Sequence, residues 1–252
     1  MARALNFVIM AGTALLAVRL FVFGLHRRYR SFFLLLILEV LRAAAVEFLG
    51  VRSNAYQKFW VLTEPLEWIF YVLVVLEIYS LVLEDFQGLA TVGRWSLIAA
   101  VSVSLLASAL SLLAPSHYAA QSRLMAYYYL AERAVYLSLV VFLLTILGLL
   151  MQYPIVLRRN IIAHSLVFSI YFLTSTVIYL LLTMAGFRMI AVVRYSIEAV
   201  NLGAVGAWLW LLNPAGEAHK QRLRPAWMPG QEEALVGQLN SLNAALLRAT
   251  RK

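Results

Sequence analysis

The chain of 252 residues contains no cysteine. It therefore forms no disulfide, no thiolate metal site and no iron–sulfur cluster, and it has no cysteine nucleophile. Aspartate is almost as scarce, because Asp85 is the only one in the sequence. Membrane enzymes that transfer prenyl or phosphoalcohol groups hold divalent metal ions with paired aspartates, since hard cations prefer several carboxylate oxygens. The composition argues against these enzyme classes.

Hydrophobic residues, in contrast, make up 63% of the chain, whereas soluble domains average about 45–50%. Seven apolar stretches approach the roughly 20 residues that a helix needs to cross the hydrocarbon core of a bilayer. They cover about 5–25, 31–50, 58–83, 95–114, 124–151, 161–185 and 189–212. The sequence thus predicts an all-α polytopic membrane protein, a bundle of seven transmembrane helices over residues 1–214 with a tail over 215–252.

Two features within these spans bear on helix shape and packing. Pro65 is expected near the start of the third span, where a first-turn proline is tolerated or a small kink results. Gly203 and Gly206, together with Ala204 and Ala207, form a patch of small residues on the seventh span. Such a patch is typical of close helix packing.

The common membrane cofactors lack their ligands in this sequence. Seven helices resemble the microbial rhodopsins in topology, but those proteins carry retinal on a lysine of the seventh helix, and span 189–212 has no lysine. Among the four histidines only His164 lies inside a predicted span, so two helices cannot supply a bis-histidine haem site. No HExxH, GxSxG or P-loop pattern occurs. We therefore expect a non-enzymatic protein without cofactor or metal, and an enzyme that acts on lipid stays open as an alternative.

The formal net charge of +9 is unevenly distributed between the loops. If the N-terminus lies outside, twelve Lys and Arg residues fall on the inner side and five on the outer side, so the positive-inside rule predicts an N-out, C-in orientation. An anionic inner leaflet explains this charge better than nucleic acid does. Short loops and a compact chain are typical of a prokaryotic inner membrane. The first stretch is expected to be a retained helix and not a removed signal peptide.

Charged residues inside the spans are the most informative feature. Seven of the eleven glutamates and four arginines lie there, although a charge within the bilayer is costly and usually marks a functional path or an internal ion pair. Because successive spans alternate in direction, sequence position predicts depth. Candidate ligand- or ion-binding residues of an outer layer are Glu47, Glu64, Glu67, Tyr71, Glu132, Arg133, Arg194, Glu198 and Asn201.

A second polar set is expected in the inner half of the membrane and comprises Arg19, Glu39, Arg42, Glu77 and His164, with Arg42 near mid-depth and able to serve either layer. Pairs such as Arg194–Glu198 and Glu39–Arg42 can simply hold the helices in register. In the outer layer, however, five glutamates face two arginines. Some carboxylates must then be protonated, bind a cation or meet a cationic ligand.

Two segments are candidate contacts with a partner protein. The tail is predicted to form a short amphipathic helix over about 231–249, in which Leu235, Leu239, Leu242 and Leu246 make one apolar seam. Such a seam suits a partner helix, a second copy of the chain or a membrane surface. The acidic pair Glu84 and Asp85 lies among basic loops on the predicted inner side and is the second candidate.

These patterns favour an integral membrane receptor or sensor with an outward-facing, acid-rich cavity between its helices. A proton- or cation-coupled transporter or channel would use the same glutamates as a relay. A scaffold or accessory subunit of a larger membrane complex would use the tail. All three hypotheses are open on the sequence, as are the ligand and the oligomeric state.

Overall fold

The computed structural model describes residues 2–50, 53–84, 91, 95, 97–99, 101–103, 106, 123–152, 156–185, 190–222 and 231–250. These residues are almost entirely helical, which confirms the all-α prediction for this part of the chain. The predicted span 95–114 falls largely outside the described residues, and Asp85 falls outside them altogether.

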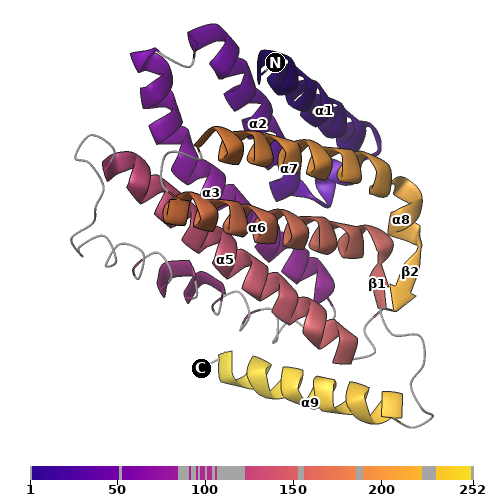
Figure 1. The fold of residues 1–252 in the computed structure, drawn as a ribbon. Helices are drawn as coiled ribbons and strands as arrows, with labels where there is room; N and C mark the ends of the chain where they lie inside the picture. The colour runs from indigo at the N-terminus through magenta and orange to yellow at the C-terminus, as the bar shows by residue number, and fades with distance from the viewer. Residues whose placement is uncertain are drawn as a thin grey trace. The chain divides into compact units, whose positions relative to one another are not determined.

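The long helices occupy the apolar stretches. They are α1 (Ala2–Val22), α2 (Arg30–Leu49), α3 (Asn54–Val82), α5 (Arg123–Gln152), α6 (Arg159–Ala185) and α7 (Ile190–Leu211) (Figure 1). The shorter elements are η1 (Leu25–Arg27), β1 (Val156–Arg158), α8 (Pro214–Ala218), β2 (Lys220–Arg222) and the tail helix α9 (Gln231–Thr250). By length and composition, three helices of the described part are apolar enough to cross a membrane, over Ala4–Val22, Lys58–Val82 and Arg159–Leu181. These three helices support a membrane protein.

The chain forms two compact units. The first contains residues 1–77 and 177–214, and the second contains residues 78–176 and 215–252. Helices α3 and α6 therefore contribute residues to both units. All of α1, α2 and α7 belong to the first unit, and all of α5 and α9 belong to the second, which also contains α8 apart from Pro214.

In the first unit, α1 packs against both α2 and α7. The chain reverses between α1 and α2 at Gly24, whose φ of 69° lies in the left-handed region that glycine adopts without strain. Leu16, Leu20 and Phe32 are fully buried. The Phe32 ring contacts the Trp208 ring of α7 at a centroid distance of 4.9 Å, so apolar and aromatic packing joins these three helices.

The close approach of α1 and α7 occurs at Gly12. A Cβ at this position would lie 3.1 Å from Cγ1 of Val205. At Gly203 and Gly206, by contrast, a Cβ would meet no heavy atom of the described residues within 4 Å. The packed face of α7 carries the buried residues Ala204 and Val205. Close packing therefore depends on the glycine of α1, and the expectation that Gly203 and Gly206 provide it is wrong.

In the second unit, an aromatic cluster joins α5 to α6. The ring of Tyr136 lies 6.0 Å from that of Tyr171 and 5.5 Å from that of Phe172. Leu139 and Leu143, on the same helix as Tyr136, are fully buried. After α7, the chain forms α8 and then β2, which pairs with β1 in an antiparallel ladder.

The tail helix α9 also belongs to the second unit, and its leucines differ in exposure. Leu239 is buried, Leu235 and Leu246 are half-buried, and Leu242 is 46% exposed. The four leucines therefore do not form one uniformly covered stripe. A partner contact through this helix stays a prediction.

We expect the substitution Gly12→Leu to destabilise the protein by about 1–3 kcal/mol, because the added side chain overpacks the contact with Val205. Thermal unfolding of the purified protein in mild detergent measures this effect. Gly203→Leu is the matched control, because it introduces the same side chain where space is open. Equal destabilisation by the two variants would contradict the assigned packing face.

Candidate functional site

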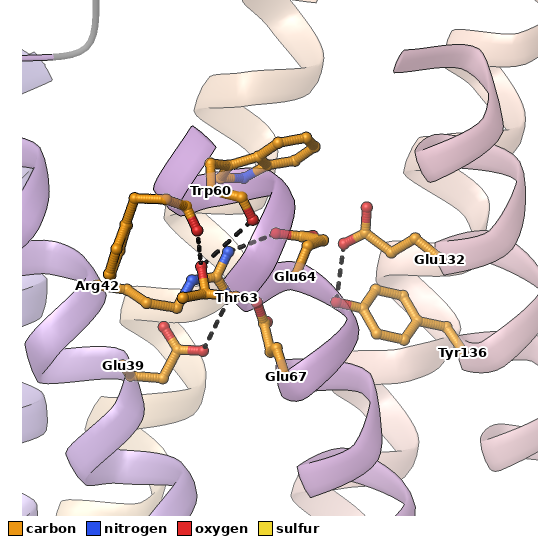
Figure 2. Close-up of polar contacts among 9 residues, drawn as sticks. Glu39, Arg42, Trp60, Thr63, Glu64, Glu67, Glu132 and Tyr136 are labelled. Atoms are coloured by element: carbon orange, nitrogen blue, oxygen red, sulfur yellow. Dashed lines mark hydrogen bonds and ion pairs between the residues drawn. The ribbon is translucent and has the colours of Figure 1, made fainter. Parts of the chain in front are cut away.

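Four charged residues of the first unit converge on one point, and we call them the Arg42 cluster. Glu39 and Arg42 come from α2, and Glu64 and Glu67 come from α3 (Figure 2). Nη2 of Arg42 lies 2.5 Å from Oε2 of Glu64, and Nη1 of Arg42 forms an ion pair with Oε2 of Glu67. Nη1 also lies 4.0 Å from Oε1 of Glu39. One guanidinium thus serves carboxylates from two helices.

Helical periodicity explains why these residues meet. Glu39 and Arg42 are three positions apart on α2, and Glu64 and Glu67 are three positions apart on α3, so each pair lies on one face of its helix. Pro65 stands between the two glutamates. It lies in the interior of α3 and not in the first turn, so its expected place near the helix start is wrong. A proline removes one backbone hydrogen bond from a helix interior, and here it does so beside the cluster.

Glu64 and Glu67 are buried and the Glu39 side chain is 36% exposed, and the cluster carries more negative than positive charge. Glu64 is 4% exposed and Glu67 is 7% exposed. With all groups ionised, three carboxylates against one guanidinium leave a formal charge of −2. An uncompensated charge away from water is very costly. A proton or a bound cation would neutralise this surplus.

The polar groups near the cluster determine which atoms can neutralise its surplus negative charge. The Oγ1 hydroxyl of Thr63 donates to the carbonyl of Phe59, 2.9 Å away in its own helix (the neighbouring Trp60 carbonyl is 3.3 Å away). That hydroxyl proton therefore serves the helix backbone and not the carboxylates. Oε1 of Glu39 is buried and has no hydrogen-bond partner among the described residues. This oxygen, 4.0 Å from Nη1 of Arg42, can accept an additional proton or cation.

Two tyrosines of α3 flank the cluster. Tyr71 is buried and lies within electrostatic range of Arg42. Tyr56 lies before the apolar part of the helix. Burial raises the pKa of its phenol, Arg42 and Arg194 oppose that rise, and Glu64 adds to it. Tyr56 is therefore within electrostatic reach of the cluster and of Arg194 on α7.

The remaining outer-layer residues of the first unit form separate contacts. Nε of Arg194 lies 2.9 Å from Oε1 of Glu198, and the Arg194 side chain is 56% exposed. Asn201, one turn further along α7, is half-buried. Glu47 accepts a hydrogen bond from Nδ2 of Asn6, 3.1 Å away on α1. These pairs are distinct from the Arg42 cluster, so the predicted layer is not one continuous network.

Glu132 and Arg133 lie on α5 in the second unit. Glu132 is buried, and its Oε1 accepts a hydrogen bond of 3.0 Å from the Tyr136 hydroxyl (Figure 2). Arg133 is half-buried. The Tyr136 ring in turn packs on Phe172. The Glu132 carboxylate is therefore hydrogen-bonded within the second unit.

Two residues of the predicted inner set act at helix ends. The carboxylate of Glu77 accepts the backbone N–H groups of Ser31 and Phe32, at 2.9 and 3.4 Å, in the first turn of α2. A carboxylate there satisfies unpaired N–H groups and complements the helix dipole. Nη1 of Arg19 donates to the carbonyl of Leu209 in the last turn of α7, where carbonyl groups lack helical partners.

The other inner residues divide between two environments. Glu39 and Arg42 join the outer-layer glutamates Glu64 and Glu67. His164 is fully buried in the second unit, and its ring stacks on that of Phe168 at 6.0 Å. Glu84, a predicted partner contact, follows α3 and is exposed. The inner set is therefore no single site.

Sequence reasoning missed Asn6 and Tyr56. Asn6 is one of few polar residues in α1, and its position early in that helix matches the depth of Glu47 late in α2. Tyr56 lies just before the third predicted span, and its phenol interacts electrostatically with Arg194. The depth argument that grouped the glutamates would have found both residues.

We expect Arg42→Met to lower the free energy of unfolding by about 3–5 kcal/mol, because it leaves buried carboxylates without their cation. Adding Glu64→Gln to this variant should restore part of the loss. Arg194→Met is the matched control and should cost at most about 1 kcal/mol, since its ion pair is exposed. Chemical or thermal unfolding in detergent measures all three variants. Equal losses for the two arginines would contradict a buried cluster.

Comparison with known proteins adds no further assignment. No protein-family model, curated protein or solved structure matches the chain.

Proposed function

We propose that this protein is a non-enzymatic membrane sensor of the receptor type, in which the Arg42 cluster binds a proton or a small cation. The observation that carries this proposal is the convergence of three carboxylates on one guanidinium. Two of these carboxylates, Glu64 and Glu67, are almost completely buried. A positively charged ligand is the species that such a group recognises.

The cluster also links two helices, which gives binding a mechanical consequence. Arg42 lies on α2, while Glu64 and Glu67 lie on α3. A proton or cation on one carboxylate weakens that carboxylate's attraction for Arg42, so occupancy changes the strength of the connection between α2 and α3. A ligand shifts a conformational equilibrium only by its difference in affinity for the two states, and this exchange of partners supplies such a difference.

The seven-span, N-out topology gives this sensor its direction. In that topology Glu64 and Glu67 lie in the outer half of the membrane, Arg42 lies near mid-depth and Glu39 lies in the inner half. The basic loops and the tail lie on the inner side. A stimulus from outside would reach the cluster, and the tail would pass the response to a partner. An acid-rich cavity open to the outside is part of the same proposal.

The main alternative is a transporter or channel that moves protons or cations through the glutamates. On α3 such a relay would connect Glu67 with Glu77. Both Glu77 oxygens, however, accept backbone N–H groups from the first turn of α2. Protonation there would weaken a helix cap, which supports a structural role for Glu77 and favours the sensor. A scaffold subunit, recognised by its obligate co-purification with another chain, is the third alternative.

A cation-response experiment on the purified full-length protein tests the proposal. We expect its unfolding temperature to rise when pH is lowered or when a small cation is added, because either neutralises the carboxylate surplus and binding stabilises the folded state by mass action. Glu64→Gln and Glu67→Gln should reduce this response. Glu47→Gln is the matched control, because Glu47 pairs with Asn6 outside the cluster.

The outcomes separate the hypotheses. If Glu64→Gln, Glu67→Gln and Glu198→Gln all left both the cation response and the stability unchanged, the sensor proposal would lose its basis. Cation flux into liposomes that Glu77→Gln abolishes would support the transporter instead. Reporter fusions at the N-terminus and in the tail measure the predicted orientation independently of the ligand.

A further inference from the structure

A small β-ladder and its neighbours in the second unit concentrate positive charge at one end of α6, and we call this element the β1–β2 clip. Strands β1 and β2 lie side by side (Figure 1). Their antiparallel register pairs the backbone of Arg158 with that of Lys220, and the backbone of Val156 with that of Arg222. The backbone N–H of Arg159, the first residue of α6, donates to the carbonyl of His219 at 3.0 Å. The ladder therefore fixes the start of α6 to the segment that follows α7 and α8.

The clip carries more cations than carboxylates among its described side chains. Arg158 and Arg159 are basic, and Glu217 of α8 forms an ion pair with Arg158. Its Oε2 lies 3.4 Å from Nη1 of Arg158, and its Oε1 accepts a hydrogen bond of 3.0 Å from Nδ2 of Asn160. Two positive charges against one negative charge leave a formal charge of +1 at the start of α6.

The position of the clip relates this charge to the membrane surface. The apolar span of α6 begins at Arg159, immediately after β1. Leu157 is buried at 3% exposure, Arg158 is half-buried and Arg159 is exposed. Successive residues of a strand face opposite sides, so the side of the ladder that carries Arg158 is the one turned away from the packed Leu157. Basic groups thus lie at the end of a membrane-spanning helix, at the depth of lipid headgroups.

We propose that the β1–β2 clip binds the phosphate headgroup of an anionic phospholipid, with Arg158 and Arg159 as its main cations. A guanidinium matches a phosphate through paired N–H donors. The acyl chains would lie along the apolar surface of α6, which a soluble phosphate does not use. Glu217 pairs with Arg158 when no lipid is bound. It therefore competes with the headgroup for Arg158 and lowers the affinity of the clip for the lipid. This site is independent of the Arg42 cluster, because it belongs to the other unit.

Lipid titration of the full-length protein tests this site. The protein in mild detergent is titrated with phosphatidylglycerol or phosphatidylcholine, and bound lipid is counted by native mass spectrometry. We expect preferential binding of phosphatidylglycerol and a loss of about tenfold or more in its affinity for the double variant Arg158→Gln, Arg159→Gln. The matched control is Arg27→Gln, Arg30→Gln, which removes two exposed arginines from the turn between α1 and α2.

A variant that is expected to raise the lipid affinity distinguishes loss of the site from misfolding. Glu217→Gln keeps an oxygen that can accept from Asn160 but removes the charge that competes for Arg158. We expect it to raise the affinity for phosphatidylglycerol, which a damaged fold would not do. If the Arg158, Arg159 variant does not fold, the single substitution Arg159→Gln leaves the contact of Arg158 with Glu217 in place and should also reduce binding.

Three results would overturn the proposal. The first is unchanged affinity in the clip variants, and the second is an equal loss in the Arg27, Arg30 control, which would indicate general attraction to the positive surface. The third is displacement of phosphatidylglycerol by inorganic phosphate at similar concentration, which would identify a site for soluble anions and not for a lipid.

Discussion

The guanidinium of Arg42 lies against carboxylates from two helices, and the charge balance of the first unit depends on this contact. Glu64 and Glu67 are buried in an apolar helix where water does not solvate them. Removing both from water is tolerable only because the guanidinium bonds to each. The guanidinium of Arg42 bonds to two carboxylates. Glu39, one turn before Arg42, adds a third carboxylate, which the guanidinium does not bond to as closely. The contacts that join α2 to α3 and the proposed ligand site therefore use the same four side chains.

Other charges of the first unit are used at helix ends, where the backbone itself needs partners. Glu77 caps the first turn of α2, and Arg19 bonds to the last turn of α7. Both contacts join helices that are distant in sequence, so they fix where one helix ends against another. These caps differ from the Arg42 cluster in the charges that interact. A capping side chain interacts with the partial charge of a helix end, whereas the cluster brings together full charges with an excess of negative ones. Buried charge in this chain therefore has two distinct uses.

Hydrophobic stretches were sufficient to place the long helices, since the cost of unsatisfied backbone groups in lipid leaves helix as the state of such a segment. The stretch predicted over 31–50, for example, corresponds to α2 at Arg30–Leu49. Alternating direction also placed Glu64 and Glu67 at one depth with Arg42 close by. Depth is only one coordinate, however, and the lateral position of a side chain depends on helix rotation and neighbours. For this reason Glu47 meets Asn6, and Arg194 meets Glu198, away from the cluster. Hydropathy also does not predict which side chains cap helices. A cap such as Glu77 depends on the end of another helix that lies close to it only in the folded chain.

The most direct test of the central claim is to detect the proton or cation that balances the carboxylates around Arg42. Infrared difference spectroscopy of the protein in a lipid bilayer, recorded as pH or cation concentration changes, reports the C=O stretch of protonated carboxyl groups separately from ionised ones. The account predicts a carboxyl signal that responds to pH or to an added cation and that is lost or altered in Glu64→Gln or Glu67→Gln, but not in Glu47→Gln. A spectrum in which no carboxyl group responds, or in which the response is the same in all three variants, would contradict it.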